Sequence, residues 1–253
     1  MFRRFLFFLF LATTLPIAFA QQQSTLRIAA AADLQPVLPP LIDQFEKQTH
    51  QKVEASYASS ATLATQILNG GPFGLFLSAD LSFPQKVIAA GLADSAEPVP
   101  YARGTLVLWA RNDSPAQPLS IDSLRSPSLR NVAVANAEHA PYGRAAKAAI
   151  EKLGLTEALK GKLVVAENIA QTAEYADSGN AEVGLISLTS ALTPRLSSAG
   201  KYIEMPGDSY PPILQGAVVL KQGPALAEAH RFLDFLLSPP VRKQLAERGL
   251  KAP

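Results

Sequence analysis

The chain of 253 residues contains no cysteine, only three histidines and a single tryptophan. The lack of cysteine excludes disulfides, thiolate metal sites and a lipid anchor attached through a cysteine. The three histidines lie far apart in the sequence and lack the spacing of zinc ligands. The sequence also has no G-x-S-x-G elbow, no G-x-x-x-x-G-K-[ST] loop and no H-E-x-x-H motif. These absences favour a binding protein over an enzyme.

The first twenty residues (1–20) have the pattern of a secretory signal peptide. A basic pair, Arg3-Arg4, precedes the apolar residues 5–15, and an A-x-A cleavage site ends at Ala20. A membrane anchor is the weaker alternative, because the apolar stretch is shorter than the ~20 residues that a membrane span needs. Pro16 also interrupts it. We therefore predict a periplasmic protein that is cleaved after Ala20.

An excess of charge of either sign is also lacking once the predicted signal peptide is removed. The formal net charge of +2 comes from the two signal-peptide arginines, whose removal leaves 21 Lys and Arg residues against 21 Asp and Glu residues. A nucleic-acid surface needs a clustered basic excess, so we expect no nucleic-acid partner. Because positive charge is not collected in any segment, an anion bound by this chain would have to be held by neutral dipoles.

Two short polar turns carry most of the functional information. The first, Ala31-Ala32-Asp33-Leu34, follows the apolar residues 26–30, and the second, at 57–63, follows residues 53–56. In both, a strand-like segment ends on tiny residues and leads through a hydroxyl or carboxyl residue into a helix-like segment. The first N–H groups of a helix lack intrahelical partners and the helix dipole favours negative charge there. Two such turns predict a binder of a small oxyanion.

Strand-like and helix-like segments alternate along the chain. The predicted strands lie at 26–30, 53–57, 75–77, 105–110, 132–135, 163–166, 183–186 and 214–220. The predicted helices lie at 34–49, 62–68, 83–90, 121–124, 142–153, 170–178, 225–236 and 241–248. The βαβα order indicates an α/β protein with mostly parallel sheets flanked by helices.

At the level of motifs, the chain resembles the periplasmic molybdate-binding proteins of ABC importers over nearly all of residues 21–253. The segments that carry the resemblance are 29–34, 57–67, 75–80 and 138–143, with weaker support from 166–169 and 184–187. The resemblance implies a two-lobed periplasmic binding protein fold of type II with the ligand cleft between the lobes. It also implies a monomer without a cofactor that closes on molybdate or tungstate and delivers it to a membrane permease.

Strand-rich stretches at 104–111 and 213–220 flank the middle third of the chain. Together with the resemblance, they indicate that the chain crosses from one lobe to the other and back at these points. Lobe one would comprise residues 24–103 and 209–253, and lobe two residues 104–208. The cleft would then lie at the carboxyl ends of the strands.

The resemblance also implies five site residues. Ser60 matches the family's hydroxyl ligand, and Tyr142 and Ile169 fall where the family offers backbone N–H groups. Two positions depart from the pattern: Asp33 stands where many members have serine, and Ser187 stands where many have a tyrosine hydroxyl. For Ser60 and Asp33 a helix N-cap is the alternative role, since both residue types are favoured caps.

Asp33 puts the identity of the ligand in doubt, because a carboxylate repels a dianion. Two unit charges 4 Å apart repel by about 4 kcal/mol at an effective dielectric of about 20. Three alternatives remain open: Asp33 points away and lends only its N–H group, it shares a proton with the oxyanion, or it coordinates the metal centre. A receptor for phosphate, sulfate or an organic anion, or a periplasmic sensor, therefore remains an alternative function.

Overall fold

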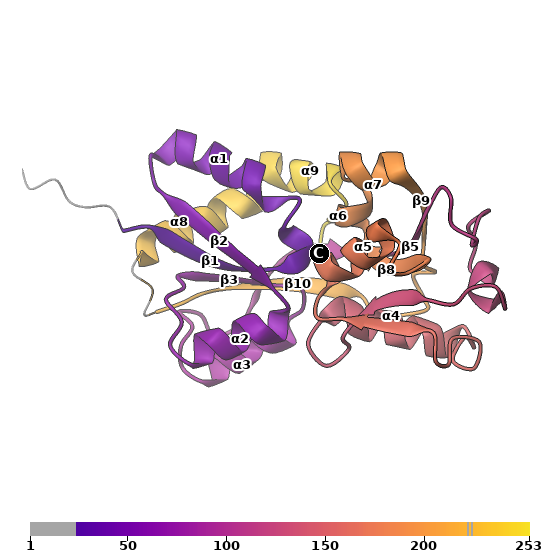
Figure 1. Cartoon of the computed structure of the whole chain (residues 1–253). Coiled ribbons are helices and arrows are strands. Elements are labelled where there is room, and N and C mark those ends of the chain that lie inside the picture. The colour runs from indigo at the N-terminus through magenta and orange to yellow at the C-terminus, as the bar shows by residue number, and fades with distance from the viewer. Residues whose placement is uncertain (1–23, 222, 224) are drawn as a thin grey trace, which may run out of the picture.

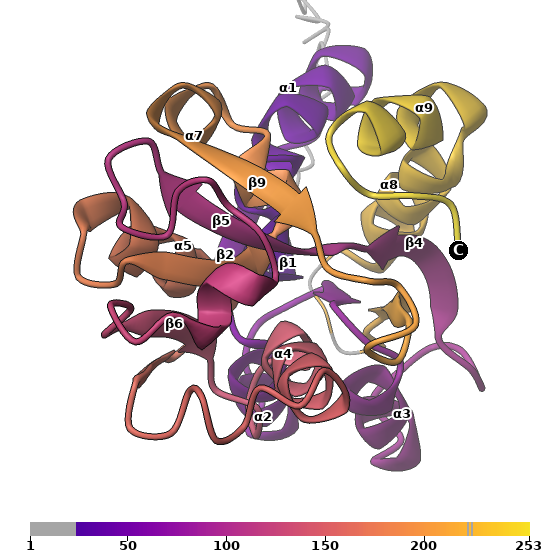
Figure 2. The same ribbon diagram turned by 90° about the vertical axis from the view of Figure 1, so that its right-hand side faces the viewer.

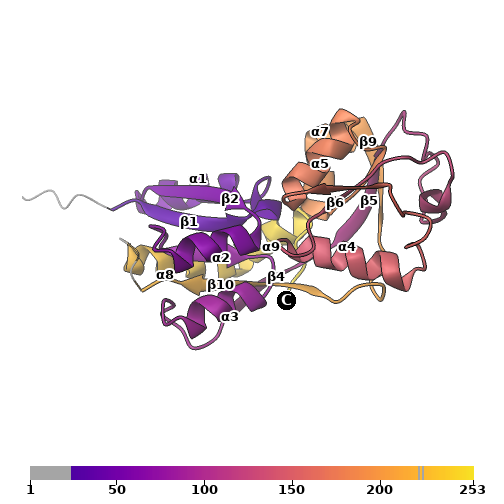
Figure 3. The same ribbon diagram turned by 60° about the horizontal axis from the view of Figure 1, so that its bottom comes forward.

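Two five-stranded sheets form two lobes that lie side by side (Figures 1 and 3). The computed structural model describes residues 24–221, 223 and 225–253, so the predicted signal peptide lies outside the described residues. Within those ranges, no helix combines the length and apolar character needed to cross a bilayer.

The first sheet has the strand order β2-β1-β3-β10-β4. Strand β1 pairs in parallel with β2 and β3, whereas β10 is antiparallel to both of its neighbours, β3 and β4. Four strands therefore run in one direction and β10 runs in the other. The bounds are β1 Leu26–Ala31, β2 Val53–Ala58, β3 Leu75–Ser78, β4 Val99–Gly104 and β10 Ile213–Val219.

Helices cover both faces of the first sheet because successive side chains of its strands point to opposite faces. Leu26 and Ile28 of β1 join one apolar core, and Ala29 between them joins the other. The first core includes residues of α1 (Leu38–Thr49), α8 (Leu226–Leu237) and α9 (Pro239–Glu247). The second core includes residues of α2 (Ser60–Leu68) and α3 (Ser82–Ala89), on the opposite side of the sheet in Figure 1.

The second sheet repeats this topology with the order β7-β6-β8-β5-β9. Here β6 pairs in parallel with β7 and β8, and β5 is antiparallel to β8 and β9. As in the first sheet, the strand next to one edge opposes the other four. The bounds are β5 Leu106–Arg111, β6 Val132–Ala135, β7 Leu163–Ala166, β8 Val183–Ser187 and β9 Gly200–Glu204.

The second sheet is also covered on both faces. Leu106 and Leu108 of β5 share a core with α4 (Pro141–Lys152), whereas Val107 and Trp109 pack with α5 (Ile169–Ser178), α6 (Leu188–Ala191) and α7 (Pro194–Ala199). Figure 2 shows α4 and α7 on opposite sides of β5 and β9. A short 3-10 helix, Asp122–Arg125, lies between β5 and β6.

The chain passes between the sheets through two links. Thr105 alone joins β4 to β5, and residues 205–212 join β9 to β10. Lys251, near the end of the chain, forms a β-bridge with Arg103 and places its Nζ 3.2 Å from Glu204. The predicted lobe boundary at 103–104 falls inside β4, and the one at 208–209 falls inside the second link. The exact boundaries of the lobes stay a prediction.

The structure corrects several predicted elements. The single helix predicted over 34–49 is divided into a 3-10 turn, η1 (Ala32–Leu34), and α1, which begins at Leu38. Pro39 and Pro40 explain the late start, because proline is tolerated only in the first turn of a helix. Strands β4 and β9 were not predicted. Both are edge strands, and β4 carries Pro100, which weakens the apolar pattern.

Helices α6 and α7 were also missed, because they lie in a stretch rich in serine, proline and glycine that reads as a loop. They are short, of four and six residues. Ser187 and Thr193 cap their first turns with side-chain oxygens, so hydroxyl residues that resemble loop residues start these helices.

An aromatic cluster anchors α8 to α1 in lobe one. The ring of Phe232 lies 5.0 Å from that of Phe45 and 5.9 Å from that of Phe235, measured between centroids. We predict that Phe232→Ala lowers the free energy of unfolding by roughly 3–5 kcal/mol, because it leaves a cavity in a packed core. Leu226→Ala on the same helix, at an exposed position, should change it by less than about 1 kcal/mol. Urea denaturation of both variants measures this difference, and equal effects would contradict it.

Candidate functional site

Strand β1 ends on tiny residues, and this brings the backbone of η1 to the junction of the lobes. Ala31, Ala32 and Asp33 are all buried, and Asp33 has no exposed surface. The N-cap role considered for Asp33 is wrong, because Ala31 occupies the cap position and no side chain caps the turn. The carboxylate of Asp33 instead takes part in a buried hydrogen-bond network.

The two carboxylate oxygens of Asp33 have different surroundings. Oδ2 accepts a hydrogen bond from Nε2 of Gln215, at 2.5 Å, and another from the hydroxyl of Tyr142, at 3.1 Å. Tyr101 in turn donates its hydroxyl proton to Oε1 of Gln215, at 2.7 Å. Within the described residues, Oδ1 of Asp33 is buried and has no hydrogen-bond partner.

Burial raises the pKa of Asp33 to about 6, although the hydrogen bonds from Gln215 and Tyr142 act in the opposite direction. Loss of hydration disfavours the charged form of a carboxyl group. The phenols of Tyr101 and Tyr142 are themselves fully buried, and desolvation together with the nearby Asp33 carboxylate raises their pKa values well above the ordinary range. Both phenols therefore remain protonated hydrogen-bond donors at any physiological pH.

At the start of α2, Ser59 caps the helix and Ser60 presents its hydroxyl group at the cavity. Ser59 is the N-cap, and its Oγ accepts the N–H of Thr62 at 3.2 Å. Ser60 is the first helical residue and not the cap, contrary to the alternative role considered for it. Its buried Oγ accepts the N–H of Ala79 at 3.1 Å, which leaves its own hydroxyl proton available to a ligand.

Tyr142 lies in the first turn of α4, directly after Pro141 at the first helical position. Its N–H group is one of those that have no intrahelical partner. Its phenol reaches across the junction to Asp33, and Gly104 makes room for it, since a Cβ at Gly104 would lie 2.2 Å from the Tyr142 hydroxyl. Gly143 allows a second close approach, because a Cβ there would lie 2.5 Å from the carbonyl of Ala135.

Ile169 is the first residue of α5, and Asn168 is its N-cap. Oδ1 of Asn168 accepts the N–H groups of Ala170 and Gln171, each at 3.0 Å. The capping side chain leaves the N–H of Ile169 at the helix start, while the apolar side chain of Ile169 packs into the core of lobe two. This placement is compatible with the backbone role that the resemblance implies.

Ser187 is the site residue that the structure keeps apart from the others. Its buried Oγ caps α6 by accepting the N–H of Ser190, and it shares hydrogen bonds with the hydroxyls of Thr189 and Ser190. Thr189, rather than Ser187, contacts η1, by donating its hydroxyl proton to the carbonyl of Asp33 at 2.8 Å. A ligand role for Ser187 therefore stays a prediction and would require a rearrangement of this hydroxyl group.

Four of the five predicted site residues line one small cavity between the lobes. The start of α2 comes from lobe one, whereas the starts of α4 and α5 come from lobe two. The cavity holds about 10 Å³, on a scale where one water needs about 10–15 Å³. It is lined by Ala31, Ala32, Asp33, Ala58, Ser59, Ser60, Ala79, Ala140, Pro141, Tyr142, Asn168 and Ile169.

Other polar contacts close the two lobes around this cavity. The N–H of Ala61 donates to the carbonyl of His139 at 3.1 Å, and the hydroxyl of Thr62 donates to Glu167 at 3.3 Å. Asp80 of lobe one forms an ion pair with Arg144 of lobe two. The structure therefore has the lobes in a closed arrangement.

Sequence reasoning missed Gln215 and Tyr101, which fix the orientation of Asp33. Gln215 had one usable signal, an amide in the otherwise apolar strand β10, and a fully buried amide needs hydrogen-bond partners. Tyr101 belongs to β4, a strand that the sequence pattern did not reveal. Among the described residues, no group of three or more His, Cys, Asp or Glu residues could hold a metal ion.

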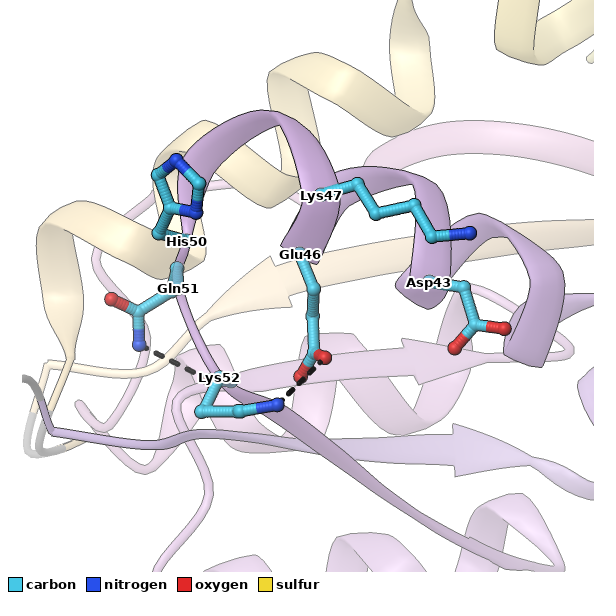
Figure 4. A pocket seen from close by; sticks show the side chains of 6 residues that line it. All are labelled: Asp43, Glu46, Lys47, His50, Gln51 and Lys52. Atoms are coloured by element: carbon cyan, nitrogen blue, oxygen red, sulfur yellow. Dashed lines mark hydrogen bonds and ion pairs between the residues drawn. The ribbon is translucent and has the colours of Figure 1, made fainter.

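A larger surface pocket of about 300 Å³ lies at the end of α1 that is remote from η1 (Figure 4). Its charged groups are partly engaged with each other, since Lys52 lies 3.2 Å from Glu46, and Glu46 accepts the N–H of Val53 at 2.8 Å. The 12 residues of α1 place it roughly 18 Å from the start of that helix. It shares no residue with the cavity between the lobes.

Comparisons with known proteins agree with this architecture. The bacterial extracellular solute-binding protein family matches residues 26–251. The molybdate-binding protein ModA of Azotobacter vinelandii is 35% identical over 237 residues, 92% of each chain. ModA of Rhodobacter capsulatus is 37% identical over 208 residues, 81% of this chain and 79% of that protein. The solved Azotobacter vinelandii periplasmic molybdate-binding protein superposes with a TM-score of 0.83 at 31% identity, covering 90% of this chain and 99% of that one.

Two similar lobes with a small cavity between them define a solute-binding protein of the two-lobed α/β type, as the resemblance predicted. The chain belongs to the bacterial extracellular solute-binding protein family.

The raised pKa of Asp33 should make the free energy of unfolding depend on pH. A carboxyl group with a higher pKa in the folded state contributes stability below its unfolded pKa of 3.8, and this contribution is lost as the pH rises through about 6. The shift corresponds to about 3 kcal/mol. We therefore expect Asp33→Asn to gain about that much stability relative to the unmodified protein between about pH 4 and pH 7.

Urea denaturation of both proteins across this pH range tests the prediction. Other titrating groups are common to the two proteins, so they cancel in the difference between their unfolding free energies. A difference that does not change with pH would mean that Asp33 has an ordinary pKa in the folded protein.

Proposed function

We propose that this protein is a periplasmic solute-binding protein that captures molybdate and delivers it to the permease of an ABC importer. The observation that carries the proposal is the convergence of the first turns of α2, α4 and α5 on one small cavity between the lobes. Helix N-termini present N–H groups and positive dipole ends, which suit a small anion. The names of two relatives that cover most of the chain, both molybdate-binding proteins, support this choice of oxyanion.

The residues that would hold the anion are the Ser60 hydroxyl and the N–H groups of Tyr142 and Ile169. Because these groups come from both lobes, an oxyanion that bonds to all of them favours the closed arrangement. Thr105 and residues 205–212 are the links at which the lobes could turn. Closure adds the two N–H bonds from lobe two to the Ser60 bond from lobe one, and each hydrogen bond to a charged ligand contributes roughly 1.5–3 kcal/mol.

The remaining expectations follow from this role. Tungstate has the same shape and charge as molybdate, so we expect it to bind as well. The protein should act as a monomer, without a resident cofactor and without catalytic turnover, and its partner should be a membrane permease. Export by the signal peptide at 1–20 would place it in the periplasm, and the solved relative is also a periplasmic protein.

A second candidate ligand is an oxyanion that carries its own proton, such as hydrogen phosphate. One observation favours it, namely the Asp33 carboxylate that lines the cavity and can accept a hydrogen bond. Sulfate carries no proton at neutral pH and has none to donate to this carboxylate, so it is the weaker alternative.

A thermal-shift panel on residues 21–253 distinguishes these ligands. We expect molybdate and tungstate to raise the melting temperature, because a ligand at about 100 times its dissociation constant stabilises a protein by about 2.7 kcal/mol. Sulfate, phosphate and chloride should have little effect. A shift with phosphate alone would replace molybdate as the ligand, and no shift with any of the anions would contradict oxyanion capture.

Ser60→Ala should weaken molybdate binding by roughly 10- to 150-fold, which corresponds to one hydrogen bond to a charged group. It should also cost about 1 kcal/mol of stability, because the N–H of Ala79 loses its acceptor. Thr193→Ala is a matched control, since Thr193 caps α7 with its hydroxyl and does not line the cavity. Calorimetric titration of both variants should show the loss of affinity only in the first, and an unchanged affinity there would remove Ser60 from the site.

A further inference from the structure

Asp33, which lines the cavity between the lobes, has a buried carboxylate oxygen without a hydrogen-bond partner among the described residues. That oxygen is Oδ1, and Ser60 and the first turns of α4 and α5 line the same cavity. Buried polar atoms in folded proteins are almost always hydrogen-bonded, and an exception needs an explanation. A ligand in the cavity is the natural partner for this atom.

The orientation of the carboxylate is fixed by its other oxygen. Oδ2 accepts hydrogen bonds from Gln215 and Tyr142, and Gln215 is itself held by the hydroxyl of Tyr101. These three side chains are buried and come from β10, α4 and β4. The carboxylate of Asp33 therefore cannot rotate without breaking both of these bonds.

Within the part of the chain that the structure describes, no cation neutralises this carboxylate. The titratable side chains that face it are the phenols Tyr101 and Tyr142, which carry no charge. Apart from the elements that hydrogen-bond the Asp33 side chain, η1 packs mainly against β2, α5 and α6. The ionisable residues of these elements are acids or phenols: Glu54, Tyr57, Glu174, Tyr175 and Asp177.

Arg144 of α4 is the cation nearest in sequence to Tyr142, and its guanidinium pairs with Asp80. It is not among the causes that shift the pKa of Asp33. A dianion at this cavity would consequently meet an uncompensated negative charge if Asp33 remained ionised.

We propose that the site binds its oxyanion together with one proton, which Oδ1 of Asp33 carries and donates to an oxygen of the anion. This inference rests on the proposed function. The balance is simple: one dianion and one proton from solvent join the ionised free protein, no covalent bond of the anion breaks, and the complex contains a neutral Asp33. A protonated carboxyl group is a hydrogen-bond donor, so the repulsive atom becomes a ligand.

The proposal has a quantitative consequence. Burial raises the pKa of Asp33 to about 6 in the closed arrangement. Above this pH the proton must be taken from solvent, so proton uptake approaches one per anion and the dissociation constant rises about tenfold per pH unit. Well below it, Asp33 already carries the proton and uptake falls towards zero.

The test is calorimetric titration of sodium molybdate into the protein at about pH 7.5, in two buffers with different heats of protonation. The dependence of the observed enthalpy on the buffer gives the number of protons taken up. We expect a value near one for the unmodified protein and near zero for Asp33→Asn, whose amide donates a hydrogen bond without titrating. The dissociation constant should rise about tenfold per unit from about pH 7 to pH 9 only in the unmodified protein.

Asp80→Asn is the matched control, because Asp80 is also an acid at the lobe junction but does not line the cavity. Its proton uptake should remain near one, even if the loss of its ion pair changes the affinity. Molybdate binding without proton uptake by the unmodified protein would overturn the inference and leave the proposed function intact. The absence of any binding heat and of any melting shift would overturn both. The proton count of the unmodified protein decides the matter even if a variant fails to fold.

Discussion

A site that holds an anion without a cation must rely on the direction of its dipoles. In this protein the first turns of α2, α4 and α5 meet at one cavity, and two different lobes supply them. A dipole interaction weakens rapidly with distance and misalignment, so the N–H groups have to approach the ligand closely. Much of the local sequence at the junction serves this requirement, from the tiny residues at the strand ends to the capping side chains.

The small residues are the clearest consequence. Ala31, Ala58, Ala79 and Ala140 all line the cavity, and each stands where a larger side chain would hold the backbone away from a ligand. Gly104 also keeps the junction free of bulk, because the absence of a Cβ leaves room for the Tyr142 phenol between β4 and α4. Bulk is thereby excluded from both lobes at the place where they meet.

The elements that form this junction could largely be predicted from sequence. The runs that end at Ala31 and Ala58 have strong apolar patterns, and helix starts with serine or proline are recognisable, so four of the five predicted residues come together at the cavity. The orientation of Asp33 could not be predicted. It depends on Gln215, which lies 182 residues further along the chain, and on Tyr101 in an edge strand with a weak pattern. No local signal reports such a contact.

At Ser187 the family pattern locates the backbone but does not predict the contact that the side chain makes. Its position was carried over from a family pattern in which a tyrosine hydroxyl extends from the same place. Serine has a much shorter side chain, and here its hydroxyl caps α6 instead. The phenol that contacts Asp33 in this chain is that of Tyr142, which reaches the junction from α4. A family position therefore predicts where the backbone lies, but the length of the side chain decides what reaches the ligand.

Asp33 also links ligand chemistry to lobe closure. Its carboxylate accepts a bond from Tyr142, and its carbonyl accepts one from Thr189, so two segments of lobe two contact a single residue of lobe one. A buried carboxylate without a cation carries a desolvation cost in the closed arrangement. That cost is lowest when the group is neutral, and an open cleft that admits water would lower it as well. The charge on Asp33 therefore opposes closure in the absence of an anion, and its neutralisation removes this opposition when an anion enters.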